Sequence, residues 1–332
     1  MKGSGINRRS FLKCSGVAAG ALMLGLEGGV VMGKSKSRVV FFETDDHKAG
    51  VTASMRALNT NPVKNKHVLI KPNFNTADRY PGSTHNDTLV GLVEEVWSMG
   101  AKSVAVGERS YPPTDAVMED MGIIPPLEKR DVRILNFDQL PDKDWVKFNP
   151  KDSHWKEGFR VARPILDAEC LISTGCLKTH QYGGVFTMSL KLHVGVVPTT
   201  RHGYGYMREL HSSPHQRKMI AEINTPFKPD LVVLDGIEAF VDGGPMTGKR
   251  AKGNVFLVST DRIAVDAVAL GVLKVLGSNE AIMGRKIFEQ EQISRAVQLG
   301  LGASSPSEIE LVPGDEKSEA YCARVAEVLA RG

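Results

Sequence analysis

Lysine side chains stand at positions from which they could hold a negatively charged ligand. Lys71 and Lys178 each come after an apolar run that predicts a buried strand, and Asn73 and Lys191 follow shortly after them. Ligands of open α/β sheets bind outside the carboxyl ends of the strands. Ammonium groups there bind carboxylates and phosphates through charge-assisted hydrogen bonds. We therefore predict that Lys71, Asn73 and Lys191 bind a ligand or cofactor; the alternative is that they are ordinary solvated side chains.

Histidines are concentrated in one Gly-rich stretch, and His180, His193, His211 and His215 are the candidate metal ligands. Imidazole binds transition metals, and its ordinary pKa of about 6.5 suits proton transfer. Ser213-Pro214 has the pattern of a helix start, which predicts that His211 lies in the preceding loop. Histidines that face solvent or make ordinary hydrogen bonds are the alternative.

An acidic residue, Asp235, follows a strongly apolar run and completes the candidate catalytic set with Lys178 and His180. A carboxylate at a strand end can act as a general base, bind a cation or orient a histidine; the alternative is an Asp that forms a turn with its own backbone. We expect Asp261 to cap the helix that follows it and Asp266, on that apolar helix, to bond a buried loop.

These residues must be positioned by alternating strands and helices. The apolar, β-branched runs that predict strands are 39–42, 67–70, 103–106, 132–137, 170–173, 231–234, 254–258 and 309–312. Apolar residues at helical spacing that end at a glycine predict helices at 86–99, 114–121, 261–276 and 287–299. This alternation predicts an α/β fold with a mainly parallel central sheet flanked by helices.

Weaker patterns interrupt this alternation. Residues 138–159 are predicted to leave the sheet. Residues 181–213 are predicted to form a functional loop insertion or lid that is rich in His and Gly. Lys178 and His180 are expected after a turn at Gly175. We predict a single α/β domain over residues 38–330, with two intimately joined lobes as the alternative.

Composition and charge exclude several classes of protein. The chain has 332 residues, 42% of them hydrophobic, and 4 cysteines, which excludes a disulfide-stapled mini-protein and a disordered chain. Four basic residues and one acidic residue precede Gly33, so the net charge of +4 leaves about +1 on the rest. A nearly neutral body without a Lys/Arg block argues against nucleic-acid binding.

The first 33 residues have the pattern of an export signal. Asn7-Arg8-Arg9-Ser10-Phe11-Leu12-Lys13 precedes a modest apolar stretch interrupted by Glu27, which resembles a twin-arginine (Tat) signal peptide. The resemblance implies export to the periplasm or the extracellular space by the Tat machinery, which carries folded proteins. A membrane anchor, through an uncleaved signal, is the alternative.

An ordered set of short motifs resembles the DUF362 family (domain of unknown function 362) over about residues 68–270. The motifs are Val68-Leu-Ile-Lys71-Pro72-Asn73, Leu177-Lys178-Thr179-His180, Ser189-Leu190-Lys191 with Gly195 and Pro198, Leu234-Asp235-Gly236-Ile237, Gly244-Pro245-x-x-Gly248 and Ser259-x-Asp261-x-Ile-Ala264-Val265-Asp266. The family also occurs attached to iron-sulfur modules. This chain lacks their Cys-x-x-Cys-x-x-Cys run, so we expect no Cys-ligated four-iron cluster, and Leu192 replaces the usual Asn.

Taken together, the sequence predicts an exported enzyme that binds a metal ion, a small anionic molecule or both in a strand-end cleft. The Tat-like signal and the family's iron-sulfur association favour redox or metal-assisted chemistry. A non-catalytic accessory protein that binds a redox partner is the alternative.

Cys170 and Cys176 are expected to be buried thiols, with a disulfide between them as the alternative.

Overall fold

The apolar runs form one central sheet because their side chains can be buried on both faces. The computed structural model describes residues 35–58 and 60–331, so the predicted export signal lies outside the described residues. The strands of the main sheet are β1 (Ser37–Glu43), β2 (His67–Lys71), β3 (Ser103–Glu108), β4 (Val132–Asn136), β7 (Cys170–His180), β8 (Val185–Thr187), β9 (Leu231–Gly243), β10 (Gly248–Ser259) and β11 (Ile309–Pro313).

The sheet is mostly parallel, as predicted. Its order is β11-β1-β10-β9-β7-β2-β3-β4, with β8 paired to β7. The exceptions are β10, which runs antiparallel to both β1 and β9, and β8, which runs antiparallel to β7. The carboxyl end of β2 therefore lies between those of β3 and the extended β7, at the edge where ligands of α/β sheets bind.

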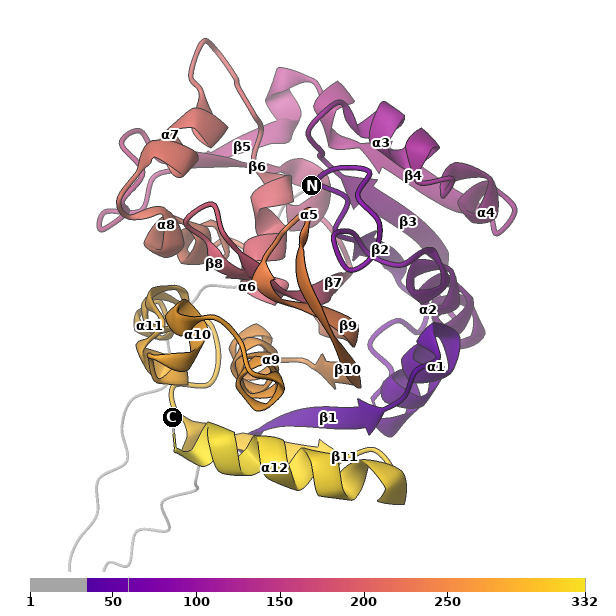
Figure 1. Ribbon diagram of the computed structural model, residues 1–332. Coiled ribbons are helices and arrows are strands. Elements are labelled where there is room, and N and C mark those ends of the chain that lie inside the picture. Colours follow the sequence, from indigo (N-terminus) through magenta and orange to yellow (C-terminus); the bar gives the residue numbers. More distant parts are fainter. Residues whose placement is uncertain (1–34, 59, 332) are drawn as a thin grey trace, which may run out of the picture. The chain divides into compact units, whose positions relative to one another are not determined.

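Helices cover both faces of the sheet (Figure 1). They are α1 (His47–Ala57), α2 (Asn86–Ser98), α3 (Thr114–Asp120), α4 (Ile124–Glu128), α5 (Arg163–Leu166), α6 (Ser189–Leu192), α7 (Tyr206–Ser212), α8 (Gln216–Ile223), α9 (Arg262–Leu276), α10 (Glu280–Met283), α11 (Glu291–Gln298) and α12 (Glu319–Ala330). Successive strand residues point to opposite faces, so Val40 packs on the α1 and α2 side while Val39 and Phe41 pack on the α9 side.

The segment predicted as a strand at 170–173 continues to His180 as one strand, so the predicted turn at Gly175 is wrong. The extension is stabilised because Lys178 pairs with Thr187 of β8 and the Thr179 hydroxyl donates to Phe240 O of β9. Lys178 and His180 therefore lie on a strand that extends beyond its neighbour β2.

The 181–213 segment contains more regular structure than a loop or lid. It forms β8, α6, a 3-10 turn at His193–Val196 and α7, and its apolar residues Phe186 and Leu190 are fully buried in the core. Asp266 of α9 accepts hydrogen bonds from the backbone N–H groups of Ser189 (2.8 Å) and Leu190 (3.0 Å), which fixes α6. The predicted role of Asp266 in bonding a buried loop is confirmed.

Other local predictions can be compared with the structure directly. Asp261 is the N-cap of α9 and accepts from two backbone N–H groups, as predicted. The predicted helix at 287–299 begins only at Glu291, after a 3-10 turn. Residues 138–159 contribute β5 (Trp145–Phe148), which pairs with β6 (Phe159–Ala162) in a separate two-stranded sheet.

The cysteines of the described chain, Cys170, Cys176 and Cys322, are buried free thiols, which confirms the burial prediction and excludes a disulfide between the first two. Burial raises the pKa of Cys176 to about 12, so this thiol is protonated and unreactive at neutral pH.

Candidate functional site

Basic side chains gather around a cavity of about 340 Å³ at the carboxyl ends of β2 and β3, against β7. We call it the basic cavity, and it is defined by the residues that carry its charge. Its basic residues are Lys71, Arg109, Lys178, Lys191 and Arg208, and its acidic residue is Glu108. The wall of the cavity therefore carries a large excess of positively charged side chains.

Lys71, at the end of β2, forms an ion pair with Glu108 at the end of β3. Lys71 Nζ lies 2.6 Å from Glu108 Oε1 and donates to Pro72 O at 2.7 Å. Burial lowers the pKa of Lys71, while Glu108 opposes that shift. A Cβ added at Gly195 would lie 2.5 Å from Glu108 Oε1 and 2.9 Å from Lys71 Nζ. Only glycine therefore lets the backbone at position 195 lie this close to the ion pair. Glu108 is therefore already engaged by a cation.

Lys178 is buried on the extended part of β7. Its ammonium group donates to Asn73 Oδ1 at 2.6 Å and also to Gly82 O. Burial lowers its pKa, and no carboxylate lies within ion-pair distance of it among the described residues. The structure thus brings Asn73 and Lys178 together in the cavity, where the amide oxygen positions the ammonium group.

Arg109 follows Glu108 in the chain and contacts the segment 194–199, which also lines the cavity. Its guanidinium donates to Val194 O at 2.9 Å and to Thr199 Oγ1 at 3.3 Å, while Nε is buried without a partner. Burial lowers its pKa. Sequence reasoning missed Glu108 and Arg109, although a charged pair directly after an apolar strand run was a usable signal.

The two histidines that line the basic cavity are His180 and His211. His180 Nδ1 is buried without a hydrogen-bond partner. Burial, followed by the charge of Lys191, lowers the pKa of His180 well below its ordinary value, and burial also lowers that of His211. Both imidazoles are therefore neutral at physiological pH. His211 lies within α7 instead of the predicted loop, and α8 begins only after His215.

The other two candidate metal ligands lie away from the cavity lining. His193 has both ring nitrogens engaged, Nε2 2.8 Å from Ser173 Oγ and Nδ1 2.7 Å from Asn224 Oδ1, so neither can bind a metal in this arrangement. The His215 ring packs against that of His154, with 4.7 Å between the centroids. In residues 35–58 and 60–331, no group of three or more His, Cys, Asp or Glu side chains could hold a metal ion. The four histidines therefore do not assemble into one metal site.

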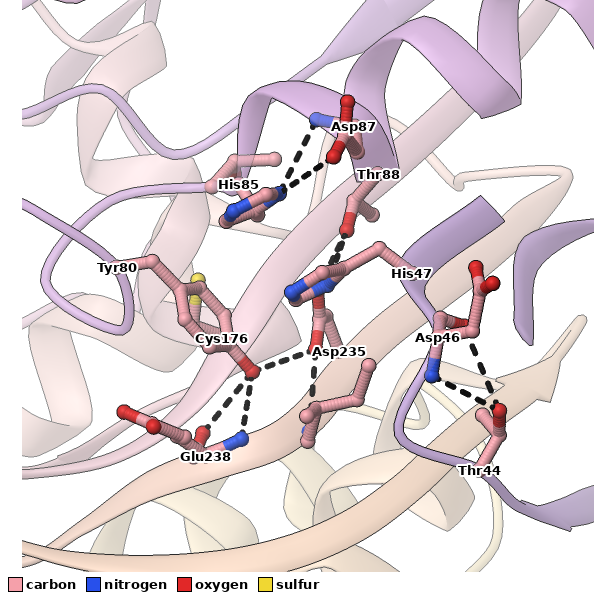
Figure 2. Close-up of polar contacts among 12 residues, drawn as sticks. Thr44, Asp46, His47, Tyr80, His85, Asp87, Thr88, Cys176, Asp235 and Glu238 are labelled. Atoms are coloured by element: carbon pink, nitrogen blue, oxygen red, sulfur yellow. Dashed lines mark hydrogen bonds and ion pairs between the residues drawn. The ribbon is translucent and has the colours of Figure 1, made fainter. Parts of the chain in front are cut away.

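Asp235 does not line the basic cavity, which corrects the expectation that it shares a cleft with Lys178 and His180. It is fully buried on β9 and accepts hydrogen bonds from the Tyr80 hydroxyl at 2.6 Å and the Thr88 hydroxyl at 2.5 Å. His47 Nδ1 lies 2.7 Å from Asp235 Oδ2, the oxygen that also accepts from Thr88, whereas Tyr80 donates to Oδ1 (Figure 2).

The reason for this placement is the alternation of side chains along β9. Val233 faces the core on the α1 and α2 side, and Asp235, two residues further on, faces the same side. Its partners come from α1, α2 and the loop before α2, which are distant in sequence, so no local pattern could have identified them. The histidine beside Asp235 is His47, which is not among the candidate site residues predicted from the sequence.

Two family models match the sequence of this chain. The family model described as domain of unknown function (DUF362) matches residues 68–271, and that of the TAT (twin-arginine translocation) pathway signal sequence matches residues 5–25. The latter supports export through the Tat machinery. Within the described part of the chain, no helix is long and apolar enough to cross a membrane.

The chain is similar in sequence to one curated relative and in fold to one solved structure. The thylakoid-associated protein sll1697 of Synechocystis is 28% identical over 214 residues, which cover 63% of each chain, so the match spans less than two thirds of that relative. The lactate racemase apoprotein from Thermoanaerobacterium thermosaccharolyticum has a TM-score of 0.41 at 13% identity, covering 67% of this chain and 54% of that chain. From the family match, which includes the lysines of the basic cavity, we conclude that this chain belongs to the DUF362 family.

Proposed function

We propose that this chain is an exported enzyme that binds a small molecule bearing a carboxylate or phosphate group in the basic cavity. The observation that carries the proposal is the charge balance of the cavity wall, in which five basic side chains accompany one carboxylate. That carboxylate is engaged by Lys71 at 2.6 Å. An anion of the ligand would supply the missing negative charge.

Burial of the cations gives the anion a large electrostatic effect. Burial lowers the pKa values of Lys71, Lys178 and Lys191, which means that their charged forms are destabilised in the cavity wall. A bound anion offsets this cost, because charges interact more strongly in a low-dielectric interior than in water. The cavity is therefore suited to bind an anion and to disfavour a cationic ligand.

His180 is the group best placed to move a proton on the ligand. Its Nδ1 has no partner, and burial keeps the ring neutral. An anion bound beside the imidazole would raise the pKa of His180 and so favour proton transfer to it.

The export signal bears on where this chemistry takes place. Because the Tat signal supports export, we propose that the enzyme works in the periplasm or outside the cell. The metal ion predicted from the sequence has no support in the described side chains, and the anion is the ligand that the geometry favours.

Titration calorimetry with inorganic phosphate and with glycolate tests the proposal. We expect saturable binding to the full chain and at least about a tenfold weaker affinity in Lys178→Met, because a buried ammonium group is lost. If Lys178→Met does not fold, the same titration is made with Lys178→Arg, which keeps the charge. Lys252→Met is the matched control, since Lys252 is exposed and lies outside the cavity lining.

Failure of both anions to bind, with circular dichroism showing folded protein, would refute the proposal. The accessory-protein alternative would then be favoured, and association with a redox partner would be the next measurement.

A further inference from the structure

The three lysines of the basic cavity differ in one respect, the partners of their amino groups. Lys71 Nζ is bound by Glu108 and Pro72 O, and Lys178 Nζ by Asn73 and Gly82 O. Lys191 lines the same cavity, yet no hydrogen bond or ion pair of its amino group occurs among residues 35–58 and 60–331. Its Nζ is therefore free to meet a ligand.

Lys191 is also held at a fixed place in the wall. It lies on α6, whose first backbone N–H groups are bound by the buried Asp266 of α9, and its neighbours Leu190 and Leu192 are buried. The short helix thus anchors the stem while the amine faces the cavity. This arrangement suits a reacting group, which must be positioned within a fraction of an ångström.

The charges around this amine are almost all positive. Charged and titratable side chains reach the cavity from β7 (Lys178 and His180), from the end of β3 (Glu108 and Arg109), from β2 (Lys71) and from α7 (Arg208 and His211). Burial, together with Lys178 and Arg109, lowers the pKa of Lys191 to about 7. At neutral pH a large share of these amines is uncharged, and only the uncharged amine has a lone pair for attack on an electrophile.

A proton-transfer partner lies beside the amine. A Cβ added at Gly184 would lie 2.6 Å from Lys191 Cε and 2.8 Å from His180 Nδ1, so the lysine stem and the imidazole meet at this glycine. His180 Nδ1 is the buried nitrogen that lacks a partner. The end of the lysine stem and the unpartnered imidazole nitrogen are thus neighbours in the cavity wall, so a ligand bound between them can pass a proton from one to the other.

We propose that Lys191 is a nucleophile that forms an imine with an aldehyde or ketone bearing a carboxylate or phosphate group. This inference rests on the proposed function, because the other cations of the cavity hold the anionic group and so place the carbonyl carbon near Nζ. It goes beyond that function by assigning a reactive residue and by restricting the substrate to carbonyl compounds.

The step is balanced without an external oxidant or reductant. The Lys191 lone pair forms a bond to the carbonyl carbon while the π electrons of C=O move to oxygen, and His180 transfers a proton from nitrogen to that oxygen. A second proton, taken up from solvent through His180, protonates the resulting hydroxyl; water then leaves as the C–O bond breaks and the nitrogen lone pair forms the C=N bond, which gives the protonated imine. The protonated imine then withdraws electrons from the bonds next to it, which favours loss of a proton or a carboxyl group there.

Reductive trapping on the full chain tests the proposal. Glyoxylate is the probe, because it carries an aldehyde next to a carboxylate, and sodium cyanoborohydride reduces an imine to a stable N-carboxymethyl amine. Peptide mapping by mass spectrometry should find the adduct on Lys191 at pH 7, formed about tenfold to a hundredfold faster than on the exposed Lys252. Excess phosphate should slow it by competing for the cavity, and its rate should level off above about pH 7.

Two variants and one non-reacting ligand separate the possible outcomes. Lys191→Arg keeps the charge but should form no adduct, and Lys191→Met should behave likewise. Glycolate has the same carboxylate but no carbonyl, so its binding reports on the anion site alone. Binding of glycolate without a glyoxylate adduct on Lys191 would overturn the imine proposal and leave the proposed function intact.

Absence of both binding and adduct would overturn the two together. Adducts spread evenly over the exposed lysines would also overturn the imine proposal, because they would show that Lys191 has no special reactivity.

Discussion

Replacing Lys191 by Met should change how the stability of the protein depends on pH. Burial and the neighbouring cations lower the pKa of Lys191 to about 7 from the ordinary 10.5, so the unfolded chain binds this proton more tightly than the folded protein does. The contribution of the amine to the free energy of unfolding is therefore lowest below pH 7, rises as the pH increases from 7 to 10.5, and is complete above that. Methionine is similar in length and carries no charge, so the variant lacks this dependence.

The size of the effect follows from the same pKa values. A fall from 10.5 to about 7 corresponds to roughly 4–5 kcal/mol against the charged form, at about 1.4 kcal/mol for each tenfold change in proton affinity. The side chain is half-buried, so solvent screens part of this cost. We expect the variant to be about 1–3 kcal/mol more stable than the wild type at pH 6, with the two becoming similar near pH 10.

Urea denaturation monitored by tryptophan fluorescence from pH 6 to 10, in buffers free of carboxylate and phosphate, measures this difference. The matched control is Lys252→Met, whose difference from the wild type should stay within about 0.5 kcal/mol at every pH, because Lys252 is exposed. A difference between wild type and Lys191→Met that does not change with pH would refute the reasoning. So would a variant that is less stable than the wild type at pH 6.

Three further outcomes are expected. Burial raises the pKa of Asp266 from 3.8 to about 7, so the wild type should lose stability relative to Asp266→Asn as the pH rises through that range; urea denaturation at several pH values measures it, and parallel curves would contradict it. Glu108→Gln should destabilise the protein by about 3–5 kcal/mol, because it leaves Lys71 as an unpaired buried cation, and added phosphate should restore part of the loss in calorimetric unfolding. Asp235→Ala should lower stability by about 3 kcal/mol or more but leave the glycolate affinity of the folded protein unchanged, because Asp235 does not line the basic cavity.

Local patterns in the sequence were enough to predict the α/β architecture. Runs of β-branched and aliphatic residues mark strands buried on both faces, and this property depends on the nearest neighbours in the chain. For the same reason Asp261 could be recognised as a helix cap and Lys71 as a strand-end cation. The strand ends were less certain, because β7 extends to His180 only through pairing with β8.

Pairing between distant side chains was decided by the tertiary structure. The sequence offers Lys71, Lys178 and Lys191 as equivalent lysines, and only the fold gives Glu108 to the first and Asn73 to the second. The third is left with a free amino group. Electrostatic interactions depend on distance in space, and the chain brings these groups together from segments more than a hundred residues apart, such as Asn73 and Lys178.

The face on which a side chain lies was likewise a property of the assembled sheet. Asp235 and Lys178 both come from strands that end at the same edge, so the sequence placed them in one cleft. Residues along a strand alternate between its two faces, and the register of β9 turns Asp235 toward His47 on the α1 side. The sequence by itself determined which residue types are available near the sheet edge. The packing of the helices on each face decided which of them share a site.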